Sequence, residues 1–83
     1  MNGAALEPLR LSLERYAGWL DRDRTSIMVR ANVQALGAAI DAGADASVPL
    51  QALVVTIARL PSGDMRKMLR ATADKFRLAL DEA

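Results

Sequence analysis

The side chains that perform most enzyme chemistry are missing from this sequence, which contains neither histidine nor cysteine. Zinc, haem and most transition-metal sites depend on one of these two residues, and disulfides and thiol catalysis need cysteine. The ten carboxylates all fall on predicted polar faces, in linkers or at helix ends. None lies within an apolar face, where burial would shift its pKa toward a catalytic value. We therefore expect no enzymatic activity, no cofactor, no metal and no small-molecule substrate.

A group of basic residues near the end of the sequence is the next candidate for chemistry. Arg66, Arg70 and Arg77 share one flank of a predicted helix, and Lys67 lies beside them. Together with the helix and turn before it, this segment has the lengths of a helix-turn-helix, with the basic residues at the start of the recognition helix. We favour a solvated face instead, because the net charge is only +1 and Asp74 stands at helical spacing from two of the arginines. A DNA-binding regulator remains the alternative interpretation.

The elements that must position these residues are predicted to be helices. Apolar residues recur at helical spacing over residues 4–20, 25–42, 47–60 and 62–81. A polar stretch at 21–26, Gly43 and the turn 61–64 separate the four segments. The pattern predicts a single all-α domain over residues 1–83, a bundle of three to four antiparallel helices that dimerisation would complete. A continuous helix over 4–42 and a strand at 54–57 are the alternatives.

The second predicted helix is apolar on two sides. One side carries only alanines, and the other carries large residues; the two sets are Ala31, Ala35, Ala38 and Ala42, and Val29, Val33, Leu36 and Ile40. A helix with so little polar circumference is typically buried on more than one side. We therefore expect this helix to be central, packed between neighbours within the fold or between subunits.

Binding to another protein is the function that the sequence favours. A chain of 83 residues has a thin margin of stability without a disulfide or a metal, which favours self-association as a homodimer. Some apolar residues also point away from the predicted core, Trp19 among them, and tryptophan is enriched in binding hot spots. The residues predicted to form the interface are Leu11, Trp19, Val29, Val33, Leu36 and Ile40.

Composition indicates the setting in which such a module would act. No apolar run approaches the roughly 18 residues that span a bilayer, and the first residues lack the pattern of a signal peptide. A cytoplasmic protein without a membrane partner is therefore expected. Nine of the eleven basic residues are arginine and alanine is abundant, which indicates a bacterial genome or a bacterial mobile element. We expect an adaptor, chaperone or inhibitor.

Overall fold

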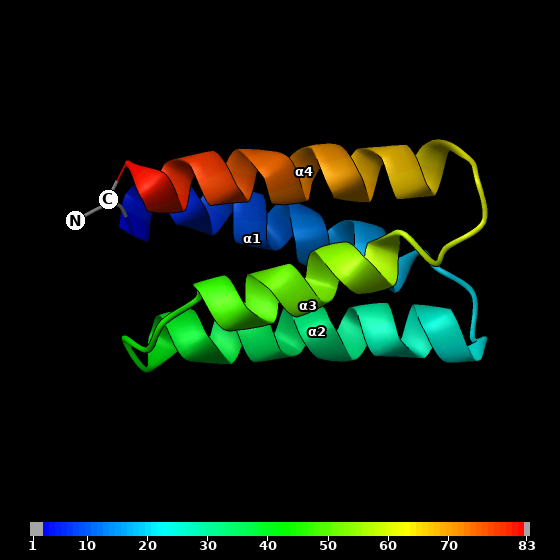
Figure 1. Ribbon diagram of the computed structural model, residues 1–83, viewed down its shortest axis with the longest axis horizontal. Coiled ribbons are helices and arrows are strands. Elements are labelled where there is room, and N and C mark those ends of the chain that lie inside the picture. The colour runs from blue at the N-terminus through cyan, green and yellow to red at the C-terminus, as the bar shows by residue number, and fades with distance from the viewer. Residues whose placement is uncertain (1–2, 83) are drawn as a thin grey trace.

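Four α-helices form the fold in a computed structural model that describes residues 3–82. They are α1 (Gly3–Gly18), α2 (Arg24–Asp41), α3 (Ser47–Ile57) and α4 (Asp64–Asp81). Each helix packs against two neighbours: α1 and α3 each contact both α2 and α4. Successive helices run in opposite directions along the long axis of the molecule (Figure 1). The predicted all-α bundle is confirmed as an antiparallel four-helix bundle with extents of 35 × 20 × 19 Å.

The core is formed by the large apolar residues that recur at helical spacing in all four helices. Its fully buried side chains are Leu13 of α1, Val29 and Leu36 of α2, Leu50, Leu53 and Ile57 of α3, and Leu69 and Phe76 of α4. Segment 54–57, which is β-branched and was open to a strand interpretation, lies at the end of α3 and is helical. The helical spacing prevails there because it places Leu53 and Ile57 together on the core side.

Within the single chain, the predicted central position of the second helix is not found. Helix α2 contacts α1 and α3 only, so it occupies one corner of the bundle like the other three helices. Its large stripe faces the core, and its alanine side faces solvent. Burial of the valine and leucine side chains removes more apolar area from water than burial of alanines would, and this selects the side that turns inward.

The connection between α1 and α2 is a real break, as the prediction favoured over one continuous helix. Helix α1 ends at Gly18, two residues before the predicted end at Leu20. The guanidinium of Arg30 donates hydrogen bonds to the carbonyl oxygens of Ala17, Leu20 and Asp21, at 3.1, 3.2 and 2.9 Å. Ala17 lies in the last turn of α1, and Leu20 and Asp21 follow in the connection to α2. A residue of α2 thus caps the end of α1.

Gly43 ends α2 as expected. Its φ of 68° lies in the left-handed region that favours glycine. Its N–H donates to the carbonyl of Ile40 at 3.1 Å, and the N–H of Ala44 donates to that of Ala39 at 2.8 Å. This pair of bonds is the Schellman arrangement, which turns the chain sharply into α3.

No helix of the described residues is both long enough and apolar enough to cross a membrane.

Candidate protein-binding surface

Large apolar side chains are exposed mainly on the outer side of α2 and α3. Seven such side chains are exposed in the described part of the chain, and four of them lie on these two helices. Their exposed fractions are 54% for Ile27, 40% for Met28, 70% for Val48 and 48% for Val55. Exposed alanines fill the space between them. We call this surface the α2–α3 face, and it comprises Ile27, Met28, Ala31, Ala35, Ala38, Ala42, Val48, Ala52 and Val55.

A polar link at the junction of the two helices makes the α2–α3 face a single surface. The side-chain amide of Asn32 donates to the carbonyl of Ala52 at 3.3 Å and to the hydroxyl oxygen of Thr56 at 2.6 Å. The Thr56 hydroxyl in turn donates to the Ala52 carbonyl at 2.9 Å. These hydrogen bonds fix how far α2 is shifted along α3, so that the middle of α2 lies beside the second half of α3. The outward residues one turn away on each helix, such as Met28 and Val55, therefore lie on one continuous side of the bundle.

The polar residues of α2 and α3 are directed to the flanks of this face. Arg30, the single charged residue of α2 between Arg24 and Asp41, extends toward the end of α1. On α3 the side-chain oxygen of Gln51 accepts a hydrogen bond from Arg77 of α4 at 2.8 Å. The middle of the α2–α3 face therefore carries no charge, which is the condition for burying it against another surface at low desolvation cost.

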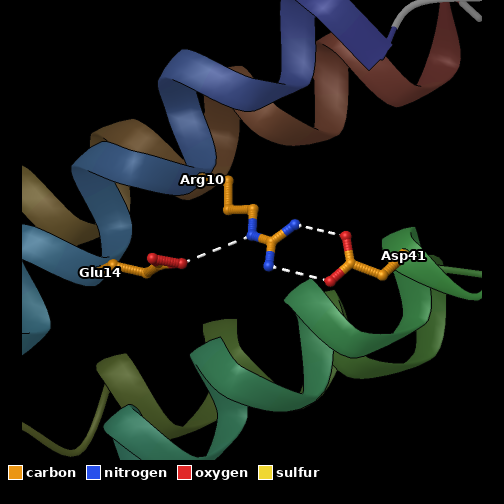
Figure 2. Close-up of polar contacts among 3 residues, drawn as sticks. All are labelled: Arg10, Glu14 and Asp41. Carbon is orange, nitrogen blue, oxygen red and sulfur yellow. Dashed lines mark hydrogen bonds and ion pairs between the residues drawn. The ribbon is translucent and has the colours of Figure 1, made fainter.

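An ion pair closes the flank between α1 and α2. Figure 2 shows the guanidinium of Arg10 between the carboxylates of Asp41 and Glu14. Two parallel bonds join Arg10 to Asp41, with Nη1–Oδ1 at 2.7 Å and Nη2–Oδ2 at 3.1 Å, and Arg10 Nε lies 3.4 Å from Glu14 Oε1. The hydrogen bond from Arg10 lowers the pKa of Asp41, and the same bond raises the pKa of Arg10. Glu14 lies one helical turn from Arg10 on α1, whereas Asp41 is 31 positions away along the chain.

Gly37 makes room for this ion pair. A Cβ atom at position 37 would lie 3.1 Å from Nε and Nη2 of Arg10 and 3.2 Å from its Cζ. These separations are shorter than ordinary van der Waals contact, so a side chain there would press on the guanidinium. Glycine in the middle of α2 therefore leaves the space that the guanidinium of Arg10 occupies.

The two ends of the α2–α3 face differ in charge. Arg24 and Arg59 border it at the start of α2 and the end of α3, which lie at the same end of the bundle. Asp45 borders it at the opposite end, where the backbone N–H and the hydroxyl of Ser47 donate to its carboxylate at 2.9 and 2.7 Å. These bonds lower the pKa of Asp45, so it is anionic at neutral pH.

The six residues predicted to form an interface do not come together on one surface. Val29, Val33 and Leu36 are buried in the core with exposed fractions of 0%, 3% and 1%, and Ile40 is half-buried against the core. Their placement at an interface is corrected by the fold, because the bundle itself covers them. Leu11 and Trp19 are exposed, at 52% and 62%, but they lie on α1 and just beyond its end.

The predicted interface does not include the exposed residues of α2, because it was placed on the side with the largest side chains. Ile27 and Met28 share the side of α2 that carries the alanines, and their helical phase places them there. The sequence therefore contains the signal, because the side with the larger residues is the one expected to turn inward.

Trp19 lines a cleft at the end of the bundle where the α1–α2 and α3–α4 connections meet. Its ring is tilted by 51° against that of Tyr16, with the centroids 5.7 Å apart. The cleft has a volume of about 420 Å³, and Pro61 and Met65 form part of its opposite wall. Trp19 is thus accessible but separate from the α2–α3 face.

The arginines of the alternative interpretation lie along the junction of α3 and α4 and have partners within the chain. Arg66 donates to the carbonyl of Leu60 at 3.2 Å and to the hydroxyl of Ser62 at 3.0 Å. Arg70 pairs with Asp74 at 3.1 Å, as expected, and Arg77 donates to Gln51. Lys67 is exposed, and with Arg66 and Arg70 it lines a cleft of about 550 Å³.

The arrangement of α3 and α4 also differs from that of a helix-turn-helix. The two helices run antiparallel as a hairpin (Figure 1), whereas the DNA-binding motif crosses its helices at about 90–120°. In this bundle the start of α4 therefore does not project as a recognition helix would.

Within the described residues, no three acidic side chains cluster in a way that could hold a metal ion. The carboxyl pKa values that are shifted, those of Asp23, Asp41 and Asp45, are lowered by hydrogen bonds from Ser26, Arg10 and Ser47 respectively. A general acid needs the opposite shift.

Comparisons of the chain with protein-family models, with curated proteins and with solved structures give no match. The class that the fold defines is the antiparallel four-helix bundle, and any functional assignment rests on the surface described above.

Proposed function

We propose that this chain is a non-enzymatic protein-interaction module that binds another protein through the α2–α3 face. The observation that carries the proposal is an uncharged, exposed apolar surface that runs the length of α2 and continues onto α3. Contiguous apolar surface of this kind, with polar residues at its borders, is typical of protein-binding sites. Single exposed apolar residues would carry no such weight, but here Ile27, Met28, Val48 and Val55 are exposed on two helices that pack against each other.

The face suits a helical or flat partner surface rather than a small molecule. Alanines at its centre allow another backbone to approach closely, and the larger side chains at its edges can fill hollows on the partner. Affinity would come from the removal of apolar area from water, less the cost of association. An adaptor, a chaperone or an inhibitor could each work in this way.

The setting that we propose is the cytoplasm of a bacterium, or of a bacterium carrying a mobile element that encodes the chain. The lack of cysteine fits a reducing compartment, and the preference for arginine and alanine fits a GC-rich genome.

The test compares protein capture by the wild type and by two variants with the same change of charge. Ala35→Glu places a carboxylate at the centre of the α2–α3 face, and Ala71→Glu places one on the exposed side of α4. Both positions are exposed helical alanines, so both variants should fold, which a circular dichroism melt would verify. Immobilised wild type and Ala71→Glu should retain the same partners from cell extract, identified by mass spectrometry. Ala35→Glu should lose them, and equal retention by all three chains would refute the proposal.

A further inference from the structure

One side of the bundle is large enough to form a stable interface with another small protein. The molecule measures 35 × 20 × 19 Å, so a whole side has a projected area on the order of 700 Å². Specific interfaces bury roughly 800 Å² on each partner. Two bundles placed side by side would therefore use most of this side and need no other surface.

The composition of the face also suits contact with a copy of itself. In a closed pair with two-fold symmetry, the same patch meets itself, so a patch of one charge sign would repel its copy. The centre of the α2–α3 face is uncharged, and Ala31 and Ala35 stand at the middle of α2. Facing alanines allow two helix axes to approach to about 8 Å, the short end of the usual range.

The charges at the two ends decide the direction in which the copies pair. If the two α2 helices were parallel, Arg24 would meet Arg24 of the other copy and Asp45 would meet Asp45. If they are antiparallel, Arg24 and Arg59 lie toward the anionic Asp45 of the other copy. The antiparallel arrangement therefore joins opposite charges at both ends of the interface.

We propose that the α2–α3 face binds a second copy of this chain about a two-fold axis that passes between the two α2 helices near Ala31 and Ala35, so that these helices are antiparallel. This inference rests on the proposed function, because it names the partner of the same surface. It places Ala31 against Ala35 of the other copy and Met28 close to Ala38. Val48 and Val55 of α3 then lie toward α3 of the other copy, which the same axis places opposite.

The first test is the mass of the wild-type chain in solution. Sedimentation equilibrium from about 1 µM to about 1 mM should show a change from one chain to two, since interfaces of this size commonly have affinities within that range or tighter. A mass of one chain at every concentration would overturn the inference. Because the capture experiment needs no self-association, the proposed function would survive that result.

The second test assigns the dimer to the α2–α3 face. Ala35→Glu should raise the dissociation constant at least about 100-fold, because it brings two unpaired carboxylates into an apolar contact. The matched Ala71→Glu variant should dimerise like the wild type. A dimer that is equally stable in both variants would use another surface, and the inference would fail.

The third test determines whether the two α2 helices are parallel or antiparallel. Because the chain contains no cysteine, only the introduced thiols can form a disulfide. A mixture of the single variants Ala31→Cys and Ala35→Cys should form a mixed disulfide rapidly on mild oxidation. Ala38→Cys alone should not, because antiparallel helices would separate the two Ala38 positions by about 15 Å along the axis. Rapid crosslinking of Ala38→Cys with itself would indicate parallel helices and overturn the proposed arrangement.

Discussion

Arg10 is the residue through which α1 and α2 are joined by charge. Its side chain is partly buried, with 22% of its surface exposed, and both of its bonds to Asp41 are within hydrogen-bonding distance. A bidentate guanidinium–carboxylate pair fixes orientation more firmly than a single contact does. The pair therefore defines how α1 sits beside α2, and its contribution should depend on the charge of Asp41.

Acidification tests that dependence. The folded-state pKa of Asp41 is lowered by the hydrogen bond from Arg10, so the folded state favours the charged carboxylate. The stability from this pair is therefore complete above the unfolded pKa, near 4, and is lost as the pH falls through the lower, folded pKa. We expect the free energy of unfolding, measured with urea between pH 7 and pH 2.5, to fall less in Asp41→Asn than in the wild type. Equal losses in both chains would show that the pair contributes nothing.

Gly37→Ala tests the space beneath the guanidinium. Alanine in place of glycine within a helix usually stabilises by about 1 kcal/mol. In the wild type, the new Cβ would press on Arg10, so we expect most of this gain to be lost. In an Arg10→Ala background the full gain of about 1 kcal/mol should appear in urea unfolding. The same gain in both backgrounds would mean that the ion pair can shift without cost.

At the scale of the helix, α2 has one apolar side in the core and another that is exposed. Substitutions on the two sides should therefore differ in their effect on the free energy of unfolding. Leu36→Ala opens a cavity in the core and should lower the free energy of unfolding by about 2–5 kcal/mol. Ile27→Ala, on the exposed side, should change the stability of the single chain by less than about 0.5 kcal/mol. Urea unfolding at concentrations below dimerisation measures both. A large loss in Ile27→Ala there would mean that the α2–α3 face is covered within the single chain.

Helix α4 offers the matching test of the DNA-binding alternative. Phosphate contacts make affinity fall steeply with salt, so binding would be strongest at low ionic strength. Because the arginines of α4 already have partners on α3, on α4 or in the connecting turn, we expect no retention of duplex DNA in a gel-shift assay at about 20 mM salt. Binding that is lost on replacing Arg66 and Arg70 by alanine would instead support the regulator.

For the molecule as a whole, the helical architecture could be predicted because the relevant signals are local. Apolar spacing marked the core side of each helix, and Gly43 and Pro61 marked two of the breaks. The fold follows, since four amphipathic helices with short connections pack as an antiparallel bundle.

The surface was harder to predict because it depends on contacts between distant residues. Arg10 finds its main partner 31 positions away, while its local spacing offers only Glu14. Likewise Arg30 reaches the end of α1, and Asn32 finds a backbone carbonyl of α3. The outward side of α2 follows from the size of its side chains, but the continuation of the surface onto α3 became defined only with the fold.

The hydrogen bonds of Asn32 have one more consequence for recognition. Because they hold α2 and α3 at a single longitudinal offset, the ridges and hollows formed by Ile27, Met28, Val48 and Val55 are already in place before any encounter. Binding of another protein then requires little further ordering of α2 and α3, so less of the binding free energy is lost in immobilising the two helices. Loosening this one amide link would leave every apolar group present and still make the surface a poorer template.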